Sequence, residues 1–119
     1  MELLDLFKHS GNKQSFKSGD LIFTEGETGD KLYVIIEGQI EIVAMRHVFE
    51  VAGPGSVVGE MALIEPGPRT AAARALTDCV VVPVDEKEFL FMTKKMPEFS
   101  LHVMGILVKR LREMDRRFN

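Results

Sequence analysis

Short runs of β-branched and aromatic residues recur along most of this chain, and they constrain its fold more than any other feature. Each run is a few residues long and is separated from the next by a turn signal such as Gly19-Asp20 or Gly53-Pro54. This pattern predicts strands joined by tight turns, at the spacing of an antiparallel barrel or sandwich. The predicted strands cover residues 21–24, 32–36, 40–43, 48–51, 57–58 and 80–84.

Helical patterns lie at both ends of the chain. Residues 2–8 suit a short helix. Asp85, with Glu88 three residues later, resembles a capping box and predicts a helix of about ten residues. Pro97 then favours the start of a second helix that runs nearly to Asn119. We therefore expect one domain over 1–119, made of an N-terminal helical segment over 1–13, a β-roll over 14–84 and closing helices over 85–119.

Length and composition narrow the class of protein. A chain of 119 residues with 45% apolar side chains suffices for one compact domain. No segment approaches the ~20 apolar residues that span a bilayer, and the acidic residues near Met1 do not fit a signal peptide. The single cysteine, Cys79, cannot form an internal disulfide, and we expect it to serve as a small buried hydrophobe. A cytoplasmic protein is the expectation.

The distribution of charge along the chain indicates whether nucleic acid is an expected partner. The net charge is −3, but residues 101–119 carry five basic and two acidic residues, which leaves the rest of the chain at −6. Non-specific binding to nucleic acid grows with the number of phosphates that Lys and Arg neutralise. Because the chain outside residues 101–119 is acidic, we expect no direct binding of nucleic acid by this chain.

The motif that carries chemistry runs from residue 59 to residue 71. Within it, Glu60 and Arg69 could face one pocket, where Arg69 would offer a planar fork of donors to phosphate oxygens and Glu60 would accept from a sugar hydroxyl. Gly59 lets the backbone come close, and a helical turn after it would direct free amides toward an anion. The pattern predicts a site for a phosphate-bearing sugar.

Together with residues 16–20, 25–26, 29–33 and Gly38, this motif resembles the cyclic nucleotide-binding domain family. That family includes bacterial catabolite activator proteins, protein kinase A regulatory subunits and cyclic nucleotide-gated channels. The resemblance covers nearly the whole chain. It implies an α+β, mainly β fold: an eight-stranded antiparallel, jelly-roll-like β-roll with a short N-terminal helix, a short phosphate-cassette helix and two C-terminal helices. It also implies cAMP or cGMP as ligand and no cofactor.

The same resemblance assigns roles within the motif. It places Glu60 on the ribose 2′-hydroxyl and Arg69 on the cyclic phosphate, with backbone amides completing the cradle. Thr70 can contact phosphate or purine, and a hydroxyl there is often associated with tolerance of cGMP, so the base stays open. The implied ligand-binding residues are Gly59, Glu60, Met61, Ala62, Arg69, Thr70 and Ala71.

Three features need separate comment. Residues 70–76 have helix-favouring composition, and only the resemblance makes them a strand. Val58 stands where the family usually has a larger aromatic residue, which predicts a slimmer pocket wall. Pro83 predicts an edge or terminal position for the strand that contains it.

The last helix has more apolar surface than one face needs. One stripe comprises Phe99, Val103, Ile106 and Leu107, with Met114 beyond, and a second comprises Leu101, Met104, Val108 and Leu111. Either one stripe packs on the roll and the other on the preceding helix, or the second stripe meets a partner copy or closes over a ligand. As lid residues we expect Arg110, Leu111 and Met114. Arg110 would pair with Glu60 or stack on the purine, unless it is an ordinary solvated charge.

The sequence bears on three classes of function. A regulatory domain that senses cyclic nucleotide and moves its C-terminal helix, toward an effector or a second copy, is favoured. A β-roll that serves only for interaction and does not bind nucleotide in the cell is the alternative. An enzyme is disfavoured, because no His or Cys lies near the motif, and the three histidines have no partners at metal-ligand spacing.

Overall fold

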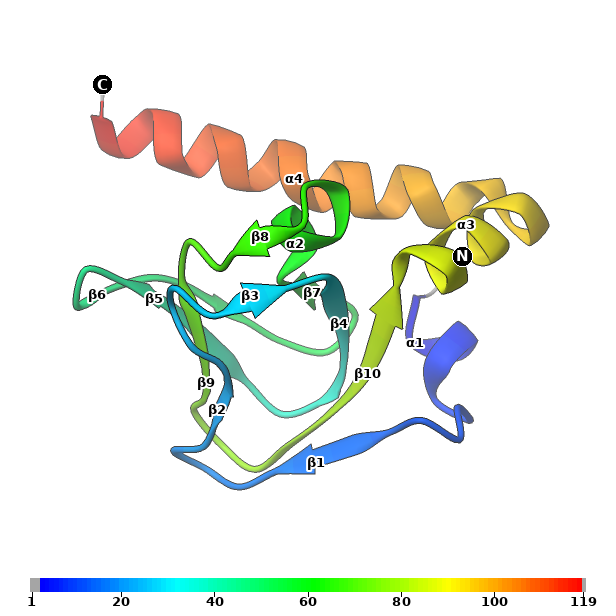
Figure 1. Ribbon diagram of the computed structural model, residues 1–119, viewed down its shortest axis with the longest axis horizontal. Coiled ribbons are helices and arrows are strands. Elements are labelled where there is room, and N and C mark those ends of the chain that lie inside the picture. Colours follow the sequence, from blue (N-terminus) through cyan, green and yellow to red (C-terminus); the bar gives the residue numbers. More distant parts are fainter. Residues whose placement is uncertain (1–2, 119) are drawn as a thin grey trace.

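The computed structural model describes residues 3–118, with side chains from residue 4 to residue 116, and it shows two four-stranded antiparallel sheets flanked by helices (Figure 1). A short two-stranded ladder completes the β structure. In spatial order, the first sheet contains β1 (Gln14–Phe16), β10 (Cys79–Asp85), β4 (Lys31–Glu37) and β7 (Val57–Val58). The second contains β2 (Leu21–Phe23), β9 (Ala72–Ala75), β5 (Ile40–Ala44) and β6 (His47–Ala52). The ladder pairs β3 (Thr28–Gly29) with β8 (Gly67–Pro68).

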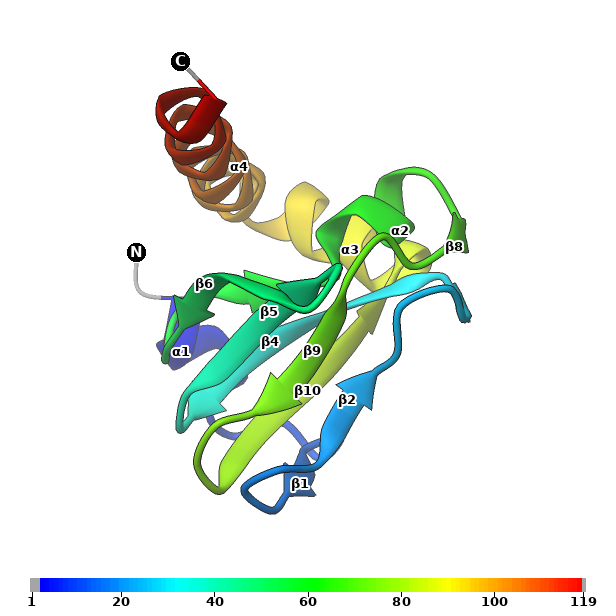
Figure 2. The ribbon, with the colours of Figure 1, turned by 90° about the vertical axis from the view of Figure 1, so that its left-hand side faces the viewer.

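The predicted α+β, mainly β fold is confirmed. The eight strands of the two larger sheets form a β-roll, although among the described residues the sheets stay separate and do not close into a barrel (Figure 2). The β3–β8 ladder was not predicted, because its residues read as turns: a two-residue pairing carries no alternation of apolar and polar residues.

The core has two layers, which explains the unbroken apolar runs of β4 and β10. Ile35 of β4 and Val81 of β10 lie between the two sheets, whereas Val34 and Val82 face the helices. Successive side chains of a strand point to opposite faces, so a strand covered on both sides is apolar throughout. The layer between the sheets contains Ile22, Phe23, Ile35, Ile40, Ala52, Val58, Ala73, Ala75, Cys79 and Val81.

The prediction of a strand within residues 70–76 is confirmed by β9, against its helix propensity. β9 lies between β2 and β5 and forms backbone pairs with both. Ala73 and Ala75 are fully buried where the sheets meet. Small side chains fit this layer, and pairing on both sides satisfies the backbone, so tertiary contacts outweigh a preference of a few tenths of a kcal/mol per residue.

Cys79 and Pro83 lie on β10. Cys79 is buried as predicted, and burial, followed by the charges of Asp78 and Asp20, raises the pKa of its thiol. The edge position expected from Pro83 is wrong for the strand as a whole, because β10 lies between β1 and β4. Pairing with β1 ends at Val81, however, so Pro83 is paired only with Tyr33 of β4.

The helices lie where the sequence predicts them. They are α1 (Leu3–Phe7), α2 (Glu60–Ile64), α3 (Glu86–Lys95) and α4 (Pro97–Phe118). The Asp85 carboxylate caps α3 by accepting from the Glu88 amide at 2.8 Å. Phe99 of α4 is fully buried and contacts the rings of Phe7 and Phe89, so it ties all three outer helices together. None of the described helices combines the length and apolar character needed to cross a membrane.

The two stripes of α4 have different environments. Phe99 and Val103 are buried against the roll, and Ile106 packs beside them. The second stripe does not pack on α3 as one alternative expected, since Leu101, Met104, Val108 and Leu111 are all exposed. In Figure 1, α4 runs past α3 and across the side of the roll that carries α2 and β8.

The β5–β6 hairpin turn offers a test of local backbone strain. Met45 and Arg46 form a two-residue connection with φ of 51° and 67°, a left-handed conformation that favours Asn and Gly. We expect Arg46→Gly to raise the free energy of unfolding by about 0.5 to 1 kcal/mol, measured by urea denaturation. His47→Gly, in the adjoining strand, should lower it instead. A destabilised Arg46→Gly variant would contradict this account of the turn.

Candidate functional site

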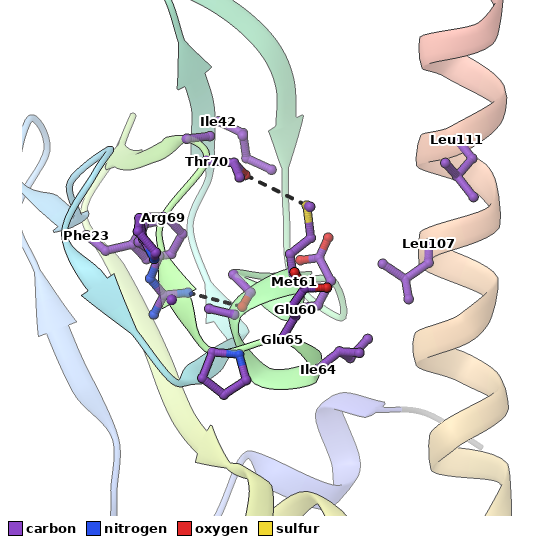
Figure 3. A pocket seen from close by; sticks show the side chains of 16 residues that line it. Phe23, Ile42, Glu60, Met61, Ile64, Glu65, Arg69, Thr70, Leu107 and Leu111 are labelled. Atoms are coloured by element: carbon purple, nitrogen blue, oxygen red, sulfur yellow. Dashed lines mark hydrogen bonds between the residues drawn. The ribbon is translucent and has the colours of Figure 1, made fainter.

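A pocket of about 450 Å³ opens between α2, the segment that follows it and α4. Figure 3 shows the side chains of α2 and of the Arg69 segment on one side and those of Leu107 and Leu111 reaching in from α4 on the other. This volume lies within the usual range for small-molecule sites. The lining residues are Phe23, Ile42, Gly59, Glu60, Met61, Ala62, Ile64, Glu65, Pro66, Gly67, Pro68, Arg69, Thr70, Ala71, Leu107 and Leu111.

The short helix α2 begins directly at the pocket. Gly59 precedes it with φ of 79°, a left-handed conformation that turns the chain sharply from β7 into the helix. No side chain of the described residues caps this helix start. The first backbone amides of a helix have no partner within it, so they are available to an acceptor at the pocket.

Arg69 forms the cationic part of the pocket and is only 7% exposed. Its guanidinium carbon lies 4.1 Å from the centroid of the Phe23 ring, and Nη1 donates to the Gly59 carbonyl at 3.1 Å. The Arg69 backbone is fixed in turn, because its amide donates to the Glu27 carbonyl and its carbonyl accepts from the Gly26 amide. Nε is buried without a hydrogen-bond partner among the described residues.

Two glycines leave the space that the Arg69 side chain fills. A Cβ at Gly29 would lie 2.2 Å from Arg69 Nε, and a Cβ at Gly59 would lie 2.6 Å from Nη1. Both contacts are far inside van der Waals distance, so any larger residue at either position would displace the guanidinium. The β3–β8 ladder, which pairs Gly29 with Gly67, is therefore part of the site.

Glu60, the first residue of α2, is 7% exposed and forms an ion pair with α4. Its Oε1 lies 2.8 Å from Nη1 of Arg110, although this N–H is not aligned for a hydrogen bond. The other nitrogens of Arg110 donate to Glu50 and to the Val57 carbonyl. The predicted pairing of Arg110 with Glu60 is therefore present, and Arg110 is not a solvated charge.

The environment of Arg110 keeps it charged. Burial by itself would lower its pKa, but the hydrogen bond to Glu50 and the negative charges of Glu60 and Glu50 outweigh this effect and raise the pKa above its ordinary value. A buried carboxylate is stable only when it is paired, so Arg110 also supplies the charge that Glu60 needs.

The remaining walls are mostly apolar. Leu107 and Leu111 of α4 line the side of the pocket across from Arg69, and Ile42 of β5 lines it beside Thr70 (Figure 3). The Thr70 hydroxyl donates weakly to the Met61 sulfur at 3.8 Å, across the gap between α2 and the Arg69 segment. An apolar wall of this kind suits a flat aromatic group, and Thr70 contributes a hydroxyl to the same lining.

The structure brings most of the predicted site together. All seven ligand-binding residues expected from the motif line the pocket, as does Leu111. Two further candidates, Val58 and Met114, are not among the residues that line it. Val58 is fully buried in the layer between the sheets, and Met114 is exposed on α4.

Sequence reasoning missed four residues that shape the site. Phe23 stacks on Arg69, Ile42 and Leu107 line the wall, and Glu50 holds Arg110. Phe23, Ile42 and Glu50 come from strands distant in sequence, where nothing sets them apart from ordinary core or surface residues. Leu107 could have been found, because it lies one helical turn before Leu111 on the same face. No group of three or more metal-ligating side chains occurs in the described part of the chain.

A buried arginine and a short helix line a pocket beside the C-terminal helix of a β-roll, and this arrangement defines a class of small-molecule-binding domain. Comparison with known proteins identifies the family within that class. A model of the family described as "Cyclic nucleotide-binding domain" matches residues 13–95. This protein therefore belongs to the cyclic nucleotide-binding domain family.

Individual relatives agree with this assignment. The CRP-like cAMP-activated global transcriptional regulator of Mycobacterium tuberculosis is 33% identical over 105 residues, which cover 84% of this chain and 47% of the relative. The crystal structure of the Thermus thermophilus catabolite activator protein has a TM-score of 0.80 at 26% identity, and the match covers 98% of this chain and 55% of that one. A cAMP-bound PfPKA-R structure has a TM-score of 0.69 at 28% identity, covering 87% and 36%. The chain thus spans about half the length of the curated relatives it matches.

Proposed function

We propose that this domain binds cAMP or cGMP in the pocket and that binding is coupled to movement of α4. The observation that carries the proposal is Arg69, a buried cation with Nε unpartnered among the described residues at the floor of a nucleotide-sized pocket. A buried donor without a partner is costly, and a phosphate oxygen would satisfy it. In this proposal the cyclic phosphate binds Arg69 and the amides of Met61, Ala62 and Ala71, and Glu60 accepts from the ribose.

Contacts from α4 support the proposed coupling between ligand binding and movement of this helix. Leu107 and Leu111 line the pocket, and Arg110 is ion-paired with Glu60. A ligand that touches both α2 and α4 binds one position of α4 better than another, and it shifts the population toward that position. The exposed stripe of Leu101, Met104 and Val108 would then carry the signal to an effector or a second copy.

The wider assignment is that of a regulatory, non-enzymatic domain. Residues 1–119 would form a single such domain in the cytoplasm, without direct binding of nucleic acid, in keeping with its acidic body. The relatives that match include transcriptional regulators. The base remains open between adenine and guanine, because the Thr70 hydroxyl could serve either.

Paired calorimetric titrations with cAMP and cGMP test the proposal. We expect at least one of them to bind with a Kd of roughly micromolar, since a few hydrogen bonds to charged groups and base burial supply that affinity. Hydrogen exchange of the α4 amides should change on binding. If neither nucleotide binds at tens of micromolar while the protein still forms a defined complex, the interaction domain is the better description. Release of AMP during long incubation with cAMP would instead indicate an enzyme.

A further inference from the structure

Glu50 lies outside the sequence motif, yet it makes the best-formed contact to the residue that links α4 with the pocket. Arg110 Nε donates to its Oε1 at 2.8 Å, and Arg110 Nη2 donates to its Oε2 at 3.0 Å. Two parallel bonds of this kind fix the plane of a guanidinium as well as its position. Nη2 also donates to the Val57 carbonyl at 2.6 Å.

The bidentate contact decides where the third nitrogen points. With Nε and Nη2 both held, only Nη1 is left to face Glu60, and its nitrogen lies 2.8 Å from Glu60 Oε1. That last contact lacks hydrogen-bond alignment, so Glu60 by itself does not orient the guanidinium. The orientation comes from Glu50 on β6 and from the Val57 carbonyl on β7.

Burial separates the roles of the two carboxylates. The Glu60 side chain is 9% exposed, whereas that of Glu50 is 32% exposed. Glu60 therefore depends on a fixed cation, while Glu50 is partly stabilised by solvent and can act as the fixed support. The two glutamates and Arg110 connect three separate elements: β6, α2 and α4.

We propose that Glu50 is a positioning residue of the nucleotide site, which holds the Arg110 guanidinium so that Glu60 is kept in place to accept the ribose 2′-hydroxyl. This inference rests on the proposed function, because it takes Glu60 as the ribose acceptor. It adds a residue from the β5–β6 hairpin to a site otherwise built from the motif and α4. A substitution of Glu50 would therefore alter binding of the ribose, although Glu50 itself is not a ligand contact in this proposal.

The test uses two ligands that differ by one hydroxyl. The dissociation constants of cAMP and 2′-deoxy-cAMP are measured by calorimetry for the wild type and for Glu50→Gln. Gln presents an amide group to one guanidinium nitrogen and loses the bidentate pair. We expect Kd for cAMP to rise about tenfold and Kd for 2′-deoxy-cAMP to change by less than about twofold, because the deoxy ligand makes no bond to Glu60.

Glu41→Gln is the matched control. Glu41 pairs with Arg74 on neighbouring strands of the same sheet, away from the pocket lining. Its loss should lower the melting temperature and leave both dissociation constants within about twofold of wild type. If Glu50→Gln does not fold, Glu50→Asp keeps the charge on a shorter side chain, and it should show a smaller loss that again affects only cAMP.

Equal loss of affinity for both ligands would show that Glu50 merely supports the fold, and it would overturn the proposal. Unchanged affinity for cAMP in Glu50→Gln would overturn it as well. Both results leave nucleotide binding by the wild type intact. Failure of the wild type to bind cAMP and cGMP would instead contradict the proposed function, and this inference with it.

Discussion

Replacing Arg69 by leucine is expected to abolish measurable cyclic nucleotide binding while the domain stays folded. Two hydrogen bonds to a phosphate charge would be lost, each worth about 1.5 to 3 kcal/mol, so Kd should rise by about a hundredfold or more. The leucine side chain would lie on the Phe23 ring, where the guanidinium now packs, and would fill much of the same space. Calorimetric titration with the better of the two nucleotides measures the change.

A matched arginine separates phosphate binding from general loss of charge. Arg74 lies on β9, five residues farther along the chain, and pairs with Glu41 instead of lining the pocket. Arg74→Leu should bind nucleotide within about twofold of wild type, since a partly exposed ion pair contributes little beyond its own neighbourhood. Unchanged binding in Arg69→Leu, with a normal melting curve, would remove the observation on which the proposed function depends.

The second large effect concerns stability and centres on Gly38. This residue has φ of +88°, and a Cβ there would lie 2.3 Å from the Asp78 carbonyl oxygen and 2.7 Å from Cys79 Cβ. Neither neighbour can move away cheaply, because Cys79 is the first residue of β10 and Asp78 directly precedes it. We expect Gly38→Ala to lower the free energy of unfolding by about 3 to 5 kcal/mol, a large part of what a domain of this size has.

Gly19 provides the control that isolates the steric part of this loss. It has φ of +93°, nearly the same as Gly38, but a Cβ there would meet nothing within 4 Å. Gly19→Ala should therefore cost only the left-handed backbone penalty of about 1 to 2 kcal/mol. Urea denaturation of both variants measures the difference. Equal destabilisation would mean that the contact with Asp78 and Cys79 is relieved by a small backbone shift.

The fold was largely predictable because its signals are local. The strand runs, the Asp85 cap and the Pro97 start each depend on a few neighbouring residues, and each is confirmed. Where two signals conflicted, at residues 70–76, only the family resemblance gave the right answer. The reason lies in pairing of β9 with β2 and β5, which no local propensity can report.

The site was predictable only in part, for a related reason. The motif placed Glu60 and Arg69 in one pocket, and the resemblance suggested the Arg110–Glu60 pair, both of which the structure contains. Val58 and Met114, which the resemblance offered as wall and lid residues, do not line the pocket, because a family resemblance does not show where the pocket of a particular chain ends. Whether the motif residues bind nucleotide stays a prediction.

The sequence by itself determined the order of strands and helices, the motif over residues 59–71 and the family to which they point, because these depend on spacing along the chain. Only the tertiary structure decided which side chains complete the site. It placed Phe23 beneath Arg69, and it brought Glu50 to Arg110 across 60 residues of chain. The packing of whole sheets and helices determines such partners. The local sequence around a single phenylalanine or glutamate in a strand does not indicate them.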